Sequence, residues 1–226
     1  MTQIETLNQI LQDRYSCRAF LPDPVPDADL TRIIDTARHV PSWCNAQPWQ
    51  VEITRGSATD RLRDCLMAAV QSGTPAPSPD LDWPTEYRDE YLDRRRTCGF
   101  QLYSAVGIDR SDREGRSRQM LRNFCFFDAP HVAIIHSPAQ LGPYGAMDSG
   151  GFVTAFTLAA TALGVATIAQ AAIAAHAPLL KQQLSIADDR LILCAISLGY
   201  ADKHAPANSF RTDRAGTDDI IRWHDT

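Results

Sequence analysis

Residues 14–18 read Arg-Tyr-Ser-Cys-Arg, and residues 41–49 read Pro-Ser-Trp-Cys-Asn-Ala-Gln-Pro-Trp. The first stretch places two guanidinium groups on either side of a serine hydroxyl, and such planar donors suit the oxygens of a phosphate. In the second stretch, the amides of Asn45 and Gln47 can pair with the alternating donors and acceptors along the edge of a heterocycle. Together the two stretches predict a cofactor with a phosphate at one end and a polar ring at the other.

These stretches resemble the R-x-S-x-R and P-S-x-x-N-x-Q-P-W signatures of the FMN-dependent nitroreductase family. The resemblance continues in the family's order through residues 126–130 (Phe-Phe-Asp-Ala-Pro), 147–151 (Met-Asp-Ser-Gly-Gly) and 198–200 (Leu-Gly-Tyr), and ends near Arg211. The R-N-x-x-F-F-D-A-P string and the Ala-Gln-Ala-Ala loop at 169–172 are most similar to the nitrobenzoate-reductase-like branch of that family.

The resemblance implies an α+β fold in which helices surround a central, mostly antiparallel sheet, within an intertwined homodimer. The residues themselves also favour α+β, because predicted helices outnumber predicted strands and do not alternate regularly with them. We expect a single nitroreductase-like domain over residues 1–226. Within it, residues 73–119 would form a variable, highly charged lid, and residues 202–226 would form a C-terminal tail that reaches the partner subunit.

Hydrophobic periodicity and capping signals place the individual elements along the chain. The predicted helices cover residues 2–12, 27–40, 57–71, 119–127, 148–164 and 178–184, and the predicted strands cover residues 49–53, 131–136, 165–168 and 191–198. We expect Asp148 to cap the long helix that follows it. That helix is rich in Gly, Ala and Thr, so it should run through the middle of the molecule, with other helices close to its backbone.

The composition narrows the possible partners. A formal net charge of −5 over 226 residues gives no basic surface, which argues against nucleic acid or an anionic membrane as a partner. Residues 149–180 carry no charge and are long enough to span a bilayer. Interspersed threonines and a central Gly164 favour a buried helix and strand instead. The six cysteines are scattered without a C-x-x-C or zinc-like spacing, which predicts free thiols and a cytoplasmic location.

The resemblance also supplies the candidate site. The residues expected to bind FMN are Arg14, Tyr15, Ser16, Cys17, Arg18, Pro41, Ser42, Trp43, Asn45, Asn123, Gln170, Ala171 and Arg211. The three arginines are the expected phosphate ligands, although each alone could equally form a surface ion pair. Gln170 is either a side-chain ligand or a packing residue. Ala171 stands where related chains often have glycine, which leaves open which backbone N–H faces flavin N5.

No residue is expected to act as a general base, because the hydride transfer at FMN N5 is the chemistry of the cofactor. The chain also lacks the G-x-S-x-G elbow of hydrolases and the glycine-rich dinucleotide fingerprint. A nicotinamide donor, NADH or NADPH, should therefore use the same open pocket as the acceptor, which predicts ping-pong kinetics.

The predicted activity is FMN-dependent NAD(P)H oxidation coupled to reduction of nitroaromatic acceptors, nitrobenzoate-like acids among them, or of quinones. Arg94, Arg95 and Arg96 in the lid are candidate partners for the carboxylate of an aromatic acid. Two alternatives stay open: another reaction on the same flavin fold, such as enone reduction, reductive dehalogenation or flavin fragmentation, and a non-catalytic flavin-binding protein.

Overall fold

The computed structural model describes residues 1–224, and the protein folds around one antiparallel sheet. The strands are β1 (Gln50–Arg55), β2 (His131–Pro138), β3 (Ala166–Gln170) and β4 (Arg190–Gly199), in the spatial order β1-β2-β4-β3. All three neighbouring pairs are antiparallel. The predicted α+β fold with a central antiparallel sheet is confirmed, and the four predicted strands form with ends that shift by only one or two residues.

Helices account for most of the remaining chain. The α-helices are α1 (Gln3–Asp13), α2 (Asp27–Ala37), α3 (Ser57–Ser72), α4 (Asp89–Ala105), α5 (Arg113–Leu121), α6 (Gly142–Ala162), α7 (Ala171–Ala174), α8 (Ala177–Leu184) and α9 (Thr217–Ile220). Short 3₁₀ helices are η1 (Trp43–Asn45), η2 (Phe126–Asp128), η3 (Ala139–Leu141) and η4 (Pro206–Asn208). Within residues 1–224, no helix has both the length and the apolar character that crossing a membrane would require.

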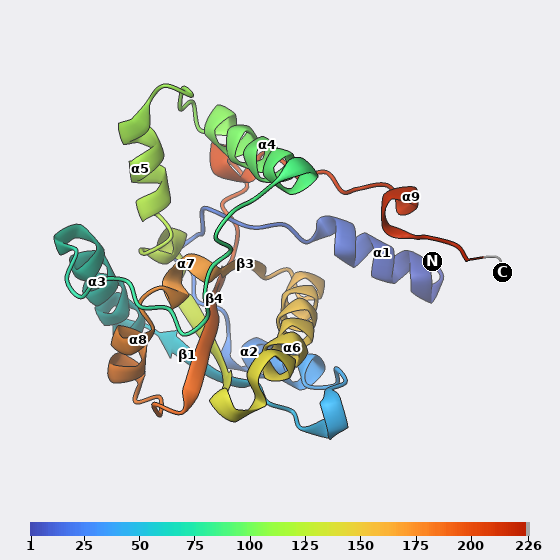
Figure 1. Ribbon diagram of the computed structural model, residues 1–226, viewed down its shortest axis with the longest axis horizontal. Coiled ribbons are helices and arrows are strands. Elements are labelled where there is room, and N and C mark those ends of the chain that lie inside the picture. The colour runs from blue at the N-terminus through green and yellow to red at the C-terminus, as the bar shows by residue number, and fades with distance from the viewer. Residues whose placement is uncertain (225–226) are drawn as a thin grey trace.

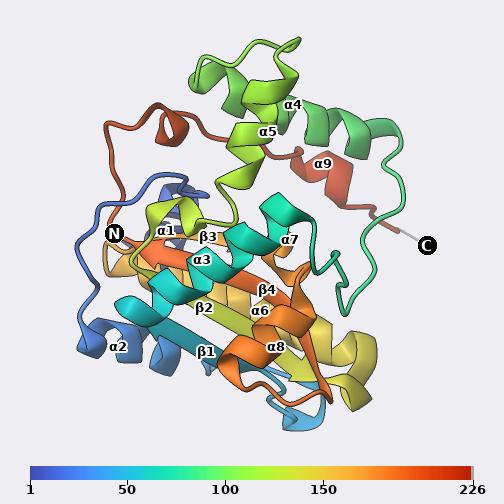
Figure 2. The same cartoon turned by 90° about the vertical axis from the view of Figure 1, so that its left-hand side faces the viewer.

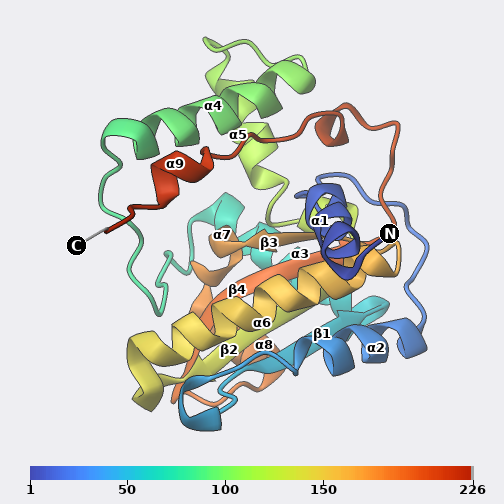
Figure 3. The same cartoon turned by 90° about the vertical axis from the view of Figure 1, so that its right-hand side faces the viewer.

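Both faces of the sheet are covered by helices, which explains the unbroken apolar run of β2. Ala133 and Ile135 pack with residues of α2 and α6, the helices that lie over the face seen in Figure 3. Val132 and Ile134 point the other way, toward the side where α3, α7 and α8 lie (Figure 2). Successive residues of a strand face opposite sides, so a strand buried on both sides needs apolar residues at every position.

The long central helix α6 starts earlier than the sequence pattern indicates. It begins at Gly142 with Pro143 in its first turn, a position where proline costs no hydrogen bond. The prediction that Asp148 caps this helix is therefore wrong. Asp148 lies inside α6, and its carboxylate accepts a hydrogen bond from the backbone N–H of Trp43 at 3.0 Å. Asp148 and Tyr144, whose ring packs on Trp43, thus hold the 41–49 segment against the N-terminal part of α6.

The predicted helix over residues 119–127 is correct only as far as Leu121. The α5 helix ends at Leu121, and Phe126, Phe127 and Asp128 have left-handed φ values of 59°, 52° and 66°. Both phenylalanines are fully buried, and this turn places both rings in the core before the chain enters β2. Arg63 supports the turn by donating to the carbonyl oxygens of Cys125 and Ala129. Tertiary burial here overrides local helix propensity.

The charged segment that was predicted as a lid contains α4 and α5, which stand apart from the sheet at the top of Figure 1. No residue of α4 is buried. The chain before it is anchored by Asp80, whose carboxylate accepts hydrogen bonds from the backbone N–H of Ile192 (2.7 Å) and from Lys181 Nζ (3.0 Å). Residues 93–97 of α4 are exposed and residues 98–103 are half-buried, while the chain leading into α4 is tied to β4 and α8.

Three buried histidines, His131, His136 and His176, connect elements of the core. Burial lowers the pKa of each ring, and the Arg190 guanidinium lowers the pKa of His136 further. His131 accepts the backbone N–H of Val25 at Nε2 (3.0 Å), and its Nδ1 lies 3.3 Å from the carbonyl oxygen of Thr54. This pair of partners requires a neutral ring that donates from Nδ1.

We expect the folded protein to lose stability as the pH falls below about 6.5, where unfolded histidines take up protons and these buried ones do not. The unfolding temperature should drop by about 2–4 °C for each kcal/mol lost. His131→Gln keeps an acceptor and a donor without titrating, so it should flatten part of this dependence. Thermal denaturation between about pH 7 and pH 5 measures the effect. If the unfolding temperatures of wild type and His131→Gln fall equally with pH, the contribution of His131 to this dependence is contradicted.

Candidate functional site

The Arg14–Arg18 segment extends the free edge of the sheet. Strand β3 is an edge strand, and the backbone N–H of Cys17 donates to the carbonyl oxygen of Thr167 at 3.0 Å. The Cys17 side chain is fully buried and anchors the segment in the core. Because side chains alternate along extended chain, Ser16 and Arg18 point away from Cys17. The burial of one cysteine thereby fixes where the neighbouring polar groups project.

A cavity of about 600 Å³ lies next to this segment, between α1 and the C-terminal tail. Its lining residues are Leu11, Gln12, Arg14, Tyr15, Ser16, Arg18, Cys98, Phe210, Arg211, Thr212 and Arg214. The guanidinium of Arg211 lies 3.7 Å from the centre of the Tyr15 ring, and that of Arg18 lies 5.7 Å from the centre of the Phe210 ring. The structure therefore brings together residues from both ends of the chain, and four of them are arginines.

Among residues 1–224, no acidic side chain forms an ion pair with the arginines of this cavity, which is called the cationic cavity below. Its lining contains no acidic residue. Burial lowers the pKa of Arg14 and Arg18, and Arg214 lowers the pKa of Arg14 further. Partly buried cations without partners cost free energy, which a bound anion would offset. Sequence reasoning missed Arg214, although it lies only three residues after Arg211.

A smaller cavity of about 180 Å³ continues from Arg14 and Ser16 along β3 toward α6. Thr167 and Ala169 line it on the strand side, with Thr157 on the helix side. The hydroxyl of Thr167 is buried and has no hydrogen-bond partner among the residues that the structure describes. An unsatisfied buried hydroxyl costs free energy and suits a polar ligand group. Nothing in the sequence around Thr167 signals this role.

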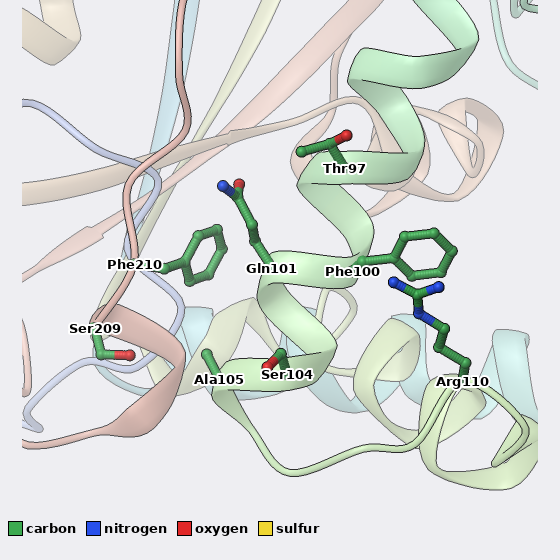
Figure 4. Close-up of a pocket in the computed structure, with 8 residues that line it drawn as sticks. All are labelled: Thr97, Phe100, Gln101, Ser104, Ala105, Arg110, Ser209 and Phe210. Atoms are coloured by element: carbon green, nitrogen blue, oxygen red, sulfur yellow. The ribbon is translucent and has the colours of Figure 1, made fainter.

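On the lid side, a third cavity of about 530 Å³ lies between α4 and the tail. Phe210 lines both this cavity and the cationic one, and its ring faces the Gln101 side chain in Figure 4. The guanidinium of Arg110 stacks on the Phe100 ring at 4.1 Å from its centre. From α4, therefore, Cys98 reaches the cationic cavity, and Gln101 reaches the neighbouring one.

The three lid arginines predicted to bind substrate do not line any of these cavities. Arg94, Arg95 and Arg96 are all exposed. Arg94 stacks on Tyr91, at 5.8 Å from the ring centre, and Arg95 stacks on Tyr87, at 5.1 Å. In a single chain they thus lie on the outer surface of α4.

Residues 41–47, which include the predicted ligands Pro41, Ser42, Trp43 and Asn45, form a tight, exposed loop. Cys44, Asn45 and Gln47 have left-handed φ values of 48°, 55° and 47°. Ser42 Oγ accepts the backbone N–H of Gln47 at 2.9 Å and closes the turn. The Asn45 amide is thereby presented to solvent by a well-defined turn of the backbone.

In Figure 3 the chain before β1 lies at the N-terminal end of α6, whereas α1, which contributes to the lining of the cationic cavity, lies near the other end of α6. The Trp43 ring packs on Tyr144, with centres 4.7 Å apart. The cavity along β3 instead meets α6 at residues 153–158, and no residue of 41–47 lines either this cavity or the cationic one. The two predicted halves of the site are therefore not brought together by a single chain.

The remaining predicted residues lie at the end of β3. The Gln170 side chain is buried, donates to the carbonyl oxygen of Asn123 at 2.9 Å and accepts a hydrogen bond from Ser197. This geometry commits the Gln170 amide to protein partners rather than to a direct contact with a ligand. Ala171 is exposed and begins α7, and Ala169 is exposed on the free edge of β3.

A family model described as Nitroreductase family matches residues 11–200. The chain belongs to the nitroreductase family. The nitroreductase NfnB of Mycolicibacterium smegmatis is 34% identical, over 97% of this chain and 93% of the relative. A 4-nitrobenzoate reductase of Pseudomonas putida is 33% identical, over 93% of this chain and 92% of the relative. The crystal structure of FMN-dependent NfnB from Mycobacterium smegmatis in complex with NADPH superimposes with a TM-score of 0.93 at 31% identity, covering 99% of this chain and 100% of that chain.

The residues of this nitroreductase-family chain fit a phosphorylated flavin. The cationic cavity supplies charge for a phosphate dianion, and the unsatisfied Thr167 hydroxyl lies on the path from that cavity along β3. Tyr15 and Ser16 line the same cavity, whereas the buried thiol of Cys17 donates to the Ala19 carbonyl oxygen. Of these predicted residues, Cys17 can therefore contribute only backbone groups.

Proposed function

We propose that this member of the nitroreductase family is an FMN-dependent NAD(P)H oxidoreductase that reduces nitroaromatic acceptors, including nitrobenzoate-like acids, and quinones. The observation that carries the proposal is the cationic cavity at the edge of β3, where four arginines lack ion-pair partners within residues 1–224. It occurs in a chain that matches relatives named nitroreductase and 4-nitrobenzoate reductase over nearly their whole length.

In this proposal, the protein binds and orients the cofactor rather than reacting itself. Arg14, Arg18 and Arg211 hold the phosphate, and the hydroxyls of Ser16 and Thr167 take the polyol chain. When bound, FMN supplies the hydride chemistry, so no protein group has to act as a general base. The lid helices limit the access of water to the ring.

The proposal includes a homodimer, because one chain leaves large apolar side chains uncovered. These are Ile4, Leu7 and Leu11 on α1, Trp43, Tyr144 and Met147 beside or on α6, and Ile220, Ile221 and Trp223 in the tail. Exposed apolar groups that cluster on neighbouring elements are typical of an interface. A second copy packed on α6 would bring its own loop 41–45 to the cavity of this chain. That loop would close the cavity, which the loop of this chain does not reach. The tail from residue 202 would reach that copy, although residues 225 and 226 lie outside the described part.

We also propose a role for the arginines of the lid. Arg94, Arg95 and Arg96 remain our proposed partners for an acidic aromatic substrate, since all three are exposed and none forms an ion pair within residues 1–224. We also propose that the whole chain is one domain with 73–119 as its variable lid.

We propose a cytoplasmic location as well, because the six cysteines are free thiols, which persist in a reducing compartment.

The purified protein should be yellow, and anaerobic addition of NADPH or NADH should bleach its visible absorbance. Adding 4-nitrobenzoate, nitrobenzene or a quinone should then restore the colour, and initial rates should follow a ping-pong pattern. A yellow protein that no reductant bleaches would instead be a flavin-binding protein without turnover. A colourless protein that does not respond to added FMN would refute the proposal, and an acceptor screen that finds only enones or halogenated phenols would favour the alternative reactions.

A further inference from the structure

Gln170 is a buried amide whose polar groups are all engaged by other parts of the chain. Its side chain is 3% exposed. Its Nε2 donates to the carbonyl oxygen of Asn123 at 2.9 Å and to Asn123 Oδ1 at 3.3 Å, and its Oε1 accepts the Ser197 hydroxyl. The donor end of the amide thus meets only oxygens, and the acceptor end meets a donor. An ionised carboxylate could not satisfy both ends, because it has no donor.

The backbone of Gln170 belongs to the strand that lies beside the proposed cofactor. Gln170 pairs with Ala195 of β4, on the inner side of β3. The carbonyl oxygen of Thr167 accepts the backbone N–H of Cys17 on the side of β3 that faces away from β4. Backbone N–H and C=O groups alternate in direction from one residue to the next along a strand. The backbone groups of Ala169, two residues later, therefore also face this free edge. Ala169 and Ala171, the two neighbours of Gln170, are both exposed. Gln170 is therefore the inward-facing residue between Ala169, which lines the cavity along β3, and the exposed Ala171.

Asn123 connects Gln170 to the lid. It lies two residues after the end of α5, and its Nδ2 donates to the carbonyl oxygen of Met120 in the last turn of that helix at 2.9 Å. The following residues are held by the left-handed turn at Phe126–Asp128 and by an ion pair between Arg122 and Asp128 at 3.0 Å. A continuous chain of hydrogen bonds thus runs from α5 through Asn123 and Gln170 to Ser197 in the middle of the sheet.

We propose that Gln170 is a positioning residue that couples the end of the lid to the edge of β3, and so sets the backbone of Ala169 and Ala171 against the flavin. This inference rests on the proposed function. It assigns Gln170 neither to direct ligation nor to inert packing. The proposed phosphate ligands Arg14 and Arg18 lie on a separate segment, which pairs with β3 at Thr167 rather than at Gln170. A change at Gln170 should therefore alter the reactivity of the cofactor and leave its retention intact.

The test is Gln170→Glu, which keeps the shape of the side chain but replaces the donor by an oxygen. At about pH 8 the carboxylate faces the Asn123 carbonyl oxygen, and kcat for NADPH-dependent reduction of 4-nitrobenzoate should fall by about tenfold or more. KM and FMN content should stay within about twofold of wild type. Protonation of the buried carboxyl restores an O–H donor, so activity should recover as the pH falls toward about 6. Neither Asn123 nor Ser197 titrates, so wild type provides the reference pH profile.

Two measurements do not depend on turnover. The oxidised-to-reduced ratio of the bound flavin at fixed potential should change by about tenfold, which corresponds to about 30 mV for a two-electron couple. Amide hydrogen exchange over residues 113–128 should become faster than in wild type. Ser197→Ala removes only the donor to Oε1 and should change both quantities in the same direction by a smaller amount, which keeps the test available if Gln170→Glu folds poorly.

Gln183→Glu is the matched control, because it makes the same charge change at an exposed position of α8 and should leave every readout unchanged. A Gln170→Glu protein with the wild-type potential and pH profile would overturn the coupling. Loss of FMN in parallel with activity at every pH would also overturn it, since that result indicates a purely structural role. A wild-type protein that is colourless and does not oxidise NADPH would instead refute the proposed function, and hydrogen exchange would still report on the link between Gln170 and the lid.

Discussion

Arg18→Met should purify largely without FMN and bind added FMN about 10–150-fold more weakly than wild type. Arg18 is partly buried, its pKa is lowered by that burial, and it has no acidic partner within residues 1–224. Its position is set in advance by a hydrogen bond to the Ser16 carbonyl oxygen at 3.1 Å and by stacking on Phe210. A charge-assisted hydrogen bond to phosphate contributes about 1.5–3 kcal/mol, which gives this range of affinity.

Fluorescence titration of the apo-protein with FMN measures this loss, and Arg18→Lys should fall between methionine and arginine because lysine lacks the planar fork. Arg38→Met is the control, since Arg38 is exposed at the C-terminal end of α2 and forms an ion pair with Asp35 of that helix. The apo form of Arg18→Met should unfold at no lower temperature than wild-type apo-protein, because an unpaired, partly buried charge has been removed. Full FMN content in Arg18→Met would show that the phosphate binds elsewhere.

Gly151→Leu should abolish the dimer while leaving the subunit folded. Gly150 and Gly151 lie on the exposed face of α6, and apart from the neighbouring backbone of α6 itself no described atom would lie within 4 Å of a Cβ at either position. Within one chain the leucine is therefore free of clashes, and it improves helix propensity by about 0.5–1 kcal/mol. Any large loss must come from a surface that packs on α6 from outside the chain. We expect a monomer of 25.0 kDa that has also lost FMN, because the Asn45 loop would come from the partner.

Size-exclusion chromatography with light scattering reports the mass, and the same FMN titration reports the cofactor. Gln183→Leu introduces the same side chain on α8, on the opposite side of the sheet from α6, and should change neither result (Figures 2 and 3). If Gly151→Leu remains a dimer with wild-type affinity for FMN, the proposed interface on α6 is wrong. A monomer that still binds FMN tightly would separate the dimer from the cofactor site.

The sequence by itself determined the features that depend on neighbouring residues. The apolar run of β2 and the periodicity of the helices predicted the sheet and most of its covering layers, because strand and helix periods are local. The spacing of Arg14 and Arg18 predicted an anion site for the same reason. Two local signals were outweighed: Gly142-Pro143 starts α6 ahead of Asp148, and burial of Phe126 and Phe127 ends the expected helix early.

Only the tertiary structure decided which distant residues meet. It placed Arg214 beside Arg14, left the Thr167 hydroxyl without a partner among the described residues, and turned Gln170 inward to Asn123 and Ser197. It also separated the Asn45 loop from the cationic cavity along α6. An arginine or an amide has the same chemistry wherever it lies in the chain. Its role depends on which groups the folded backbone brings within hydrogen-bonding or Coulombic range, and those groups lie many residues away in the sequence.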